Sequence, residues 1–388
     1  MAEFELGINY WPARTAMAMW SNFEPPVLDE DFARIADAGL TSVRFFLLWE
    51  TFQPEAHRLE VSALDNLARL LEMLGARGLR GIPTLFCGHM SGVNWLPDWT
   101  LQPNRPHGRF RTISDGRPSP FGIAEFYAPG PLLAAQRFAV REIGRRFRVH
   151  EAIALWDLGN EFSNLREPPD SQTAAAWSRM LTDELHAASG HPVTGGIHGE
   201  DLERDRHIRP SSICAPWQPP TMHGYSVYSA FARDRRDPEV VPFLADAVAS
   251  FSGKALLFSE FGNPSCVPGA GGAFACLDEE EMAEYASDVL DRLQRRGALG
   301  ALWWCYTDYD ESLARTPPFD NAPHELHFGA WRADGTPKPV VQALSRFAAE
   351  HRDVVPRTGP TLDEADWYAQ PMDERAQYAA YLERVGAT

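Results

Sequence analysis

The fold is decided by one stretch of the sequence, Ala154-Leu155-Trp156-Asp157-Leu158-Gly159-Asn160-Glu161-Phe162. The apolar run between Glu151 and Gly159 is typical of a strand buried on both faces of a parallel sheet. Asn160 and Glu161 follow the strand directly. In a (β/α)8 barrel the chemistry lies where strands end, so this polar pair is well positioned to act. The alternative is that the pair forms the start of a helix, where both residue types are common.

The rest of the chain alternates between further strand-like and helix-like segments. Besides the opening stretch, strands are predicted at 4–9, 41–48, 80–86, 192–197, 222–227, 255–259 and 299–305. Helices are predicted at 29–38, 62–76, 132–147, 171–188, 238–251, 277–296 and 339–350. Eight strands alternating with helices indicate a parallel α/β architecture. An open doubly wound sheet is the rival, but the sequence has no GxGxxG or GxxxxGK[ST] phosphate turn.

We therefore predict an α/β protein with a (β/α)8 TIM barrel, long βα loops and a short helical appendage at the C-terminus. The catalytic barrel is expected to span residues 1–350. Residues 351–388 are expected to form an extension that packs on its outside. The longest loop, residues 88–130, is rich in proline and aromatic residues and is predicted to be irregular.

Composition limits the partners and the location. The chain has 388 residues, 44% of them hydrophobic, and a net charge of −17, which disfavours nucleic acid and anionic membranes as partners. Residues 1–10 lack the basic and apolar regions of a signal peptide, and no run approaches the ~18 apolar residues of a membrane span, so a cytoplasmic protein is expected. Reduced thiols are the simplest account of the five cysteines, although Cys266 and Cys276 could pair across a glycine-rich loop.

A second carboxylate ends a second strand, in Ala255-Leu256-Leu257-Phe258-Ser259-Glu260-Phe261-Gly262. Its setting repeats that of Glu161, so the two glutamates should face each other from strands four and seven. Paired carboxylates across a cleft are the minimal equipment for glycoside hydrolysis, in which one protonates the leaving oxygen while the other attacks the anomeric carbon or activates water. A single strand-end glutamate could be only a structural acceptor. Two in matching contexts favour the catalytic interpretation.

Other strand ends are polar or aromatic in a compatible way. Arg44 lies in strand two, where a buried guanidinium needs an anionic partner. His89 follows strand three, and His223 and Tyr225 follow strand six, although a lone histidine is often structural. At the end of strand eight, Trp303-Trp304 offers a flat ring to a sugar, and one of the two must belong to the core because adjacent strand residues point in opposite directions.

These residues together resemble glycoside hydrolase family five, which belongs to clan A. The resemblance covers roughly residues 4–350 and depends on the order and strand positions of Arg44, His89, Asn160-Glu161, His223-Gly224-Tyr225, Glu260 and Trp304. The stretch Trp304-Cys305-Tyr306-Thr307-Asp308-Tyr309-Asp310-Glu311 is similar to the eighth-strand segment of family-five cellulases, which selects Trp304 over Trp303.

The resemblance implies a retaining mechanism that needs no metal and no cofactor. Glu161 would be the general acid/base, with its pKa raised by burial and by Glu260. Glu260 would be the nucleophile, with its pKa lowered by Arg44 and Tyr225. The remaining matches imply that Asn160 binds the sugar 2-hydroxyl, with His89 and His223 lining the first sugar subsite above a floor formed by Trp304. The two carboxyl groups should then lie about 5–5.5 Å apart.

The substrate implied is a short β-linked oligosaccharide. The signature Asn9-Tyr10-Trp11-Pro12 resembles a family-five branch that includes β-mannosidases. Trp11 and Trp95, on the loops after strands one and three, are expected to help bind the sugar. At least one of Trp95, Trp99, Phe121 or Tyr127 should lie near it and close one end of the cleft. An exo-acting β-mannosidase is thus expected, with a β-glucosidase, endo-glucanase or mannanase as the alternative.

Two other classes of protein are disfavoured by particular residues. A non-catalytic carbohydrate-binding barrel would be expected to have lost one of the two glutamates. An aldolase or isomerase barrel would need a strand-end lysine or a carboxylate cluster for Mg²⁺. Lys254 instead precedes strand seven and Lys338 lies near a helix start.

Overall fold

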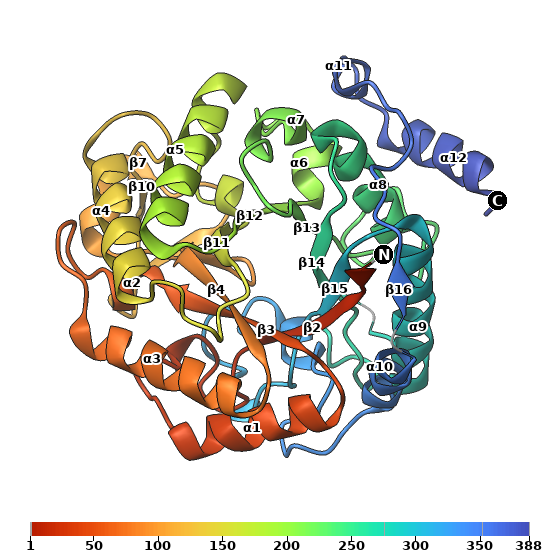
Figure 1. The fold of residues 1–388 in the computed structure, drawn as a ribbon, viewed down its shortest axis with the longest axis horizontal. Helices are drawn as coiled ribbons and strands as arrows, with labels where there is room; N and C mark the ends of the chain where they lie inside the picture. Colours follow the sequence, from red (N-terminus) through yellow and green to blue (C-terminus); the bar gives the residue numbers. More distant parts are fainter. Residues whose placement is uncertain (1, 275, 351, 388) are drawn as a thin grey trace.

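Eight parallel strands close into a barrel in the computed structural model, which describes residues 2–274, 276–350 and 352–387 (Figure 1). In chain order the barrel strands are β2 (Glu5–Tyr10), β3 (Ser42–Leu48), β4 (Arg80–Cys87), β11 (Trp156–Asn160), β12 (Val193–His198), β13 (Thr221–His223), β14 (Leu257–Phe261) and β15 (Gly300–Trp303). The ring closes where β15 pairs with β2. The predicted (β/α)8 fold is therefore confirmed.

Helices surround the barrel and follow its strands in turn. The long ones are α1 (Pro25–Asp37), α3 (Val61–Ala76), α4 (Pro131–Arg146), α5 (Ser171–Ser189), α8 (Val240–Ser252), α9 (Glu279–Arg296) and α10 (Pro339–Ala349). After β12 the place of a long helix is taken by two short ones, α6 (Gly199–Glu203) and α7 (Pro210–Ile213). Within the described part of the chain, no helix combines the length and apolar character needed to cross a membrane.

Local sequence explains where these helices begin and end. In α9, the Asp278 side chain accepts from the Glu281 amide while the Glu281 side chain accepts from the Asp278 amide, which forms a capping box. The helix ends at Gly297, whose φ of +86° favours glycine. It therefore begins at Glu279, two residues later than the apolar pattern predicts, because Asp278 is the cap.

Side chains fill the lower part of the barrel. Ile82, Leu155, Leu257 and Leu302 form a buried cluster separate from the main core, which lies between the strands and the helices. Such packed layers are characteristic of this barrel, whose interior is not a pore. The polar residues at the C-terminal strand ends thus lie above a packed apolar layer inside the barrel.

Residues 88–130 are not irregular, which corrects the prediction. They form a small sheet of β5 (His89–Met90), β6 (Val93–Trp95), β8 (Arg111–Ser114) and β9 (Arg117–Ser119), and β7 (Leu101–Pro106) pairs with β10 (Phe121–Ile123). The strands are two to six residues long and are interrupted by prolines, so no alternating pattern develops. Likewise β13 ends at His223, four residues before the predicted end, and a turn follows.

The expectation that all five cysteines are reduced is wrong for one pair. Cys266 and Cys276 form a disulfide, whereas Cys87, Cys214 and Cys305 are free and buried. A backbone bridge between Ser265 and Leu277 brings the two ends of the intervening loop together. The pairing of Cys266 with Cys276 thus follows from the Ser265–Leu277 bridge, which the sequence alone did not predict.

The C-terminal segment lies against the barrel's outer helices and loops (Figure 1). Of the expected extension, residues 351 and 388 lie outside the described residues. Its helices are α11 (Glu364–Trp367) and α12 (Glu374–Val385). The rings of Trp367, Tyr378 and Tyr381 pack around Phe243 of α8, at centroid distances of 5.1–5.5 Å. Trp367 Nε1 also donates to the Leu202 carbonyl at 2.9 Å, at the end of α6.

Replacing Trp367 tests whether this extension is part of the folded unit. Trp367→Ala should lower the free energy of unfolding by about 3–5 kcal/mol, since a buried indole and its hydrogen bond are lost. Val355→Ala is the matched control, because Val355 is 58% exposed and should change stability by less than about 0.5 kcal/mol. Denaturant unfolding measures both, and equal stability of the two variants would mean that the extension is only loosely attached.

Candidate active site

A cavity of about 360 Å³ opens at the C-terminal ends of the barrel strands. Seven of the residues predicted from the sequence line it, namely His89, Asn160, Glu161, His223, Tyr225, Glu260 and Trp304. Of the other three, Arg44 lies beneath Glu260, whereas Trp11 and Trp95 are not among the lining residues. The barrel therefore brings together residues far apart in sequence, as the positions of its strand ends require.

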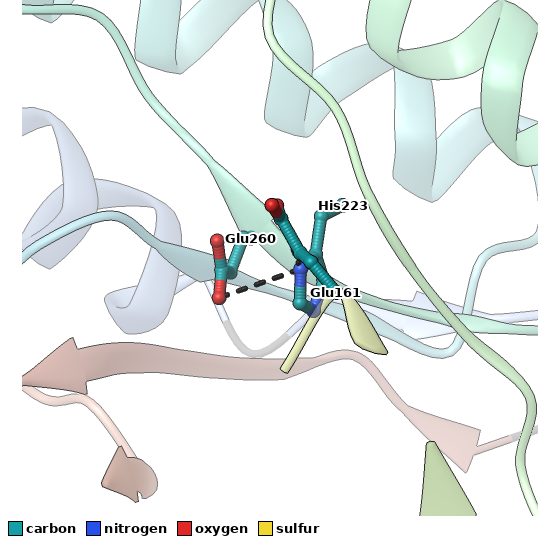
Figure 2. A group of neighbouring side chains, drawn as sticks. All are labelled: Glu161, His223 and Glu260. Carbon is teal, nitrogen blue, oxygen red and sulfur yellow. Dashed lines mark hydrogen bonds and ion pairs between the residues drawn. The ribbon is translucent and has the colours of Figure 1, made fainter. Parts of the chain in front are cut away.

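The two glutamates face each other across the cavity. Glu161 directly follows β11 and Glu260 lies in β14, and a carboxylate oxygen of each lies within 4.8 Å of the other. The His223 imidazole lies against both, with Nδ1 3.4 Å from Glu161 Oε1 and 3.5 Å from Glu260 Oε1 (Figure 2).

Glu260 is held from two sides by donors. Arg44 Nη1 donates to Oε1, and the Tyr225 hydroxyl donates to Oε2 at 2.7 Å. The Glu260 side chain is only 4% exposed. Its orientation is therefore fixed before any ligand binds.

Arg44 is fully buried and uses its whole fork of donors. Nε donates to Asp157 Oδ2 at 2.8 Å, and Nη2 lies 2.7 Å from the same oxygen. Nη1 also donates to Asn9 Oδ1, and Nη2 to Asn160 Oδ1, both at 3.0 Å. The anionic partner that a buried guanidinium requires is thus supplied twice, by Asp157 and Glu260.

Glu161, in contrast, lies among neutral groups. His89 Nε2 and His198 Nδ1 are 3.8 and 3.9 Å from its Oε2, and Asn164 Nδ2 donates to Oε2 at 3.1 Å. Burial lowers the pKa of His89 to about 4, and also places the pKa values of His198 and His223 well below the usual range. No imidazolium is therefore available to keep Glu161 ionised.

His198 was not predicted from the sequence, although it ends β12 as other site residues end their strands. Arg206 Nη1 donates to its Nε2 at 3.0 Å, so Nε2 is the acceptor and Nδ1 carries the proton that faces Glu161. Ser163 Oγ lies 3.2 Å from His198 Nε2 and donates to Asp201 Oδ1 at 2.7 Å. The position of His198 at a strand end was the available signal.

The two carboxyl groups differ in acidity. Burial, and then the charge of Glu260, raises the pKa of Glu161 well above its ordinary value. Burial also raises the pKa of Glu260, although Arg44 and Tyr225 oppose the rise. Arg44 and Tyr225 each act to lower the pKa of Glu260, as expected, but desolvation outweighs them and the net shift is upward. Glu260 nevertheless ionises first, since it alone has a cation and a hydroxyl donor.

The aromatic residues are arranged differently from the prediction. Trp304 lines the cavity and meets the Phe46 ring edge to face at a centroid distance of 5.8 Å, and Trp11 stacks on the same Phe46 ring at 5.4 Å. Trp11 is 1% exposed and therefore braces the floor from behind. Trp95 packs against the core.

None of Trp95, Trp99, Phe121 and Tyr127 lines the cavity, so that prediction is corrected. From residues 88–130, the aromatic ring in the wall is Phe110, which packs on His89 at 4.5 Å. Phe110 lies in a bend between β7 and β8, outside any strand, so no alternating pattern in the sequence singles it out.

Polar contacts between loops enclose the cavity. Ser91 of the segment after β4 donates to Glu325 of the segment after β15 at 3.0 Å, and Arg111 pairs with Asp320 of the same two segments. On the other side Arg109 pairs with Glu200 at the start of α6. The site is thus a pocket rather than an open groove.

The described residues include one group of three acidic or histidine side chains close enough to share a metal ion, and it is Glu161, His223 and Glu260. Arg44 and Tyr225 already donate to Glu260, and Asn164 to Glu161. Within the described residues, Arg44 is therefore the cation that contacts this cluster, and Tyr225 and Asn164 add neutral donors.

Neither protein-family models nor curated protein sequences match this chain. Solved structures do. Exo-beta-1,4-mannosidase Op5Man5 from Opitutaceae bacterium strain TAV5 is 24% identical with a TM-score of 0.73, over 89% of this chain and 59% of that one. A GH5_18 protein from Streptomyces cattleya in complex with GlcNAc is 20% identical with a TM-score of 0.80, over 100% of this chain and 92% of that one.

A variant of the Streptomyces cattleya protein, in complex with Manb1-4GlcNAc, is also similar, with a TM-score of 0.79 and 20% identity over 99% of this chain and 92% of that one. The chain thus spans less than two thirds of the Opitutaceae enzyme and nearly all of the GH5_18 proteins. At these identities the likeness establishes the fold. The (β/α)8 barrel that the resemblance implied is confirmed.

Proposed function

We propose that this protein is a retaining glycoside hydrolase that removes single sugars, most specifically β-mannosyl units, from the end of short β-linked oligosaccharides. The observation that carries the proposal is the proximity of the Glu161 and Glu260 carboxylate oxygens, which lie within 4.8 Å of each other. Retaining enzymes hold their two carboxyl groups about 5–5.5 Å apart, whereas inverting enzymes need about 6.5–9.5 Å to admit water.

The reaction begins with ionised Glu260 and protonated Glu161. A carboxylate oxygen of Glu260 attacks the anomeric carbon while Glu161 gives its proton to the glycosidic oxygen, so the aglycone leaves as an alcohol. Glu161, now ionised, takes a proton from water, and the water oxygen attacks the anomeric carbon. The bond to Glu260 breaks and the sugar leaves with its original configuration.

The surroundings of each glutamate support these roles. Burial and the charge of Glu260 favour the protonated form of Glu161, and the guanidinium of Arg44 favours the ionised form of Glu260. In this proposal Asn160 binds the sugar 2-hydroxyl, His89 and His223 line the same subsite, and Trp304 is its floor. Arg44 and Tyr225 position Glu260.

Two observations support exo action on a mannoside. The contacts of Ser91 with Glu325 and of Arg111 with Asp320 close the side of the pocket above β2 and β3, where a longer chain would continue. Among the similar structures, one is called an exo-beta-1,4-mannosidase and another is in complex with Manb1-4GlcNAc.

A panel of nitrophenyl glycosides beside manno- and gluco-oligosaccharides tests the proposal. The β-mannoside should be hydrolysed fastest, and chromatography of early products from mannotetraose should show mannose before any disaccharide. Glu161→Gln is the control for contaminating activity, since it retains the shape of the site. Faster cleavage of the β-glucoside would replace mannose by glucose as the preferred sugar. Random internal cleavage would exclude exo action. Complete inactivity would refute the proposed glycosidase activity.

The roles of the two glutamates predict different responses to azide. Glu161→Ala should still cleave a nitrophenyl glycoside, because nitrophenolate needs little protonation, but should lose about 10²–10⁴-fold on an oligosaccharide. Azide should accelerate this variant and give a glycosyl azide of retained configuration. Glu260→Ala lacks the covalent route, so azide should give slow formation of the inverted product.

The anomeric configuration of each azide, measured by NMR, distinguishes the roles. A retained azide from the Glu260 variant together with an inverted azide from the Glu161 variant would mean that the roles are reversed. Wild-type enzyme treated in parallel should be unaffected by azide, because its deglycosylation already has a general base.

Arg44 should set the acidic limb of the pH profile of kcat/KM. Arg44→Met removes a positive charge beside Glu260, which raises the pKa of that carboxyl. As the pH is lowered, activity should therefore begin to fall at a higher pH than in the wild type. Arg44→Lys is the matched control, because it retains the charge and should shift the limb less while still reducing kcat/KM. Circular dichroism confirms folding of each variant, and an unmoved limb in the methionine variant would exclude electrostatic tuning by Arg44.

A further inference from the structure

Glu325 lies in the wall of the cavity but has no part in the chemistry proposed above. It belongs to a short 3₁₀ helix, η5 (Pro323–His327), in the segment that follows β15. The residue is 8% exposed, although it carries a carboxylate. A carboxylate held so deeply in a cavity wall needs donors around it.

Two hydroxyl groups hold this carboxylate in place. The Tyr228 hydroxyl donates to Oε1 at 2.6 Å, and Ser91 Oγ donates to Oε2 at 3.0 Å. The Tyr228 oxygen also lies 2.8 Å from His324 Nε2. Because the phenol has one proton and gives it to Glu325, His324 Nε2 must be the donor to the phenol oxygen.

Each of these hydroxyl bonds uses one acceptor position of the carboxylate. An ionised carboxylate offers about four such positions on its two oxygens, so donors from the cavity can still bind. Among the described residues, its ion-pair partner within 4 Å is His324, at 3.7 Å, and burial lowers the pKa of that histidine. Glu325 is thus held by neutral donors in the cavity wall, and the two hydroxyls leave acceptor positions on its oxygens unused.

A continuous wall connects Glu325 with the nucleophile. Tyr225 donates to Glu260, its ring packs against Tyr228 at 5.5 Å, and Tyr228 donates to Glu325. Glu325 is therefore connected to Glu260 through two tyrosines and lines the same cavity. Its contact with Ser91 is also one of the two contacts that join the segments after β4 and β15.

We infer that Glu325 binds neighbouring hydroxyl groups of the terminal sugar, at the end of the ring remote from the anomeric carbon. This inference rests on the proposed function and names its specificity residue. A carboxylate can accept from two adjacent hydroxyls, and such charge-assisted hydrogen bonds are about twice as strong as neutral ones. The substrates are then β-glycosides whose terminal sugar has these hydroxyls free, and a chain extended at that position cannot enter.

The test compares wild type with Glu325→Gln, which retains the shape but removes the charge. On the nitrophenyl glycoside that wild type cleaves fastest, Glu325→Gln should lower kcat/KM by about 10–100-fold. Glu311→Gln is the matched control, because Glu311 is exposed in the same segment, and it should behave as wild type. Substrate analogues that lack one remote hydroxyl should be poor substrates for wild type. For the Glu325→Gln variant, removing the same hydroxyl should lower kcat/KM only slightly further.

The double comparison decides between a binding role and a structural one. If removing a hydroxyl lowers kcat/KM by the same factor for wild type and for Glu325→Gln, then Glu325 does not contact that hydroxyl. Equal factors at every remote hydroxyl overturn the inference. Tyr228→Phe is the second variant, since it keeps the ring but frees Glu325, and it should weaken discrimination of the same hydroxyl. Thermal unfolding verifies that each variant is folded.

Failure of the proposed function is distinguishable from failure of this inference. If wild type cleaves no glycoside, titration calorimetry with the free monosaccharides still compares wild type and Glu325→Gln. Weaker binding to the variant supports the sugar contact, whereas equal binding, or none to either protein, overturns it.

Discussion

The rest of the site depends on the buried guanidinium of Arg44. It donates to Asn9 of β2, Asp157 and Asn160 of β11 and Glu260 of β14, so one side chain on β3 ties together four strands of the barrel. A charge this deep is tolerated only because two carboxylates share it. The same contacts that satisfy Arg44 therefore orient the Asn160 amide and Glu260, the proposed nucleophile. Structure and chemistry cannot be separated at this position.

The asymmetry between the two glutamates also follows from this arrangement. Arg44 is close to Glu260, whereas the groups around Glu161 are imidazoles that burial keeps neutral. Arg206 determines which nitrogen of His198 carries a proton, so even the neutral ring presents a defined face to Glu161. Two identical side chains thereby acquire opposite protonation states from their surroundings alone, which is the general route to acid and base roles at one pH.

The sequence predicted the barrel and the two glutamates because the evidence for them is local, an apolar run followed by a polar residue. Contacts between distant loops have no such local pattern. Glu325, His198 and the pairing of Cys266 with Cys276 were consequently missed or left open. Trp11 was misplaced for a related reason, since an aromatic residue in a loop can face a ligand or brace the floor, and only packing distinguishes the two.

The backbone of Glu161 has a consequence for how this site persists. Its φ of +45° lies in the left-handed region, where a residue other than glycine costs of order 1–3 kcal/mol. Glycine at this position would relieve that strain and remove a desolvated carboxyl group. Replacing Glu161 by glycine would thus increase the stability of the fold. In a barrel that needed only to bind sugars, random mutation would therefore remove this glutamate. In the proposed mechanism the protein therefore keeps its proton donor although folding alone would favour its loss, as expected where stability and activity oppose each other.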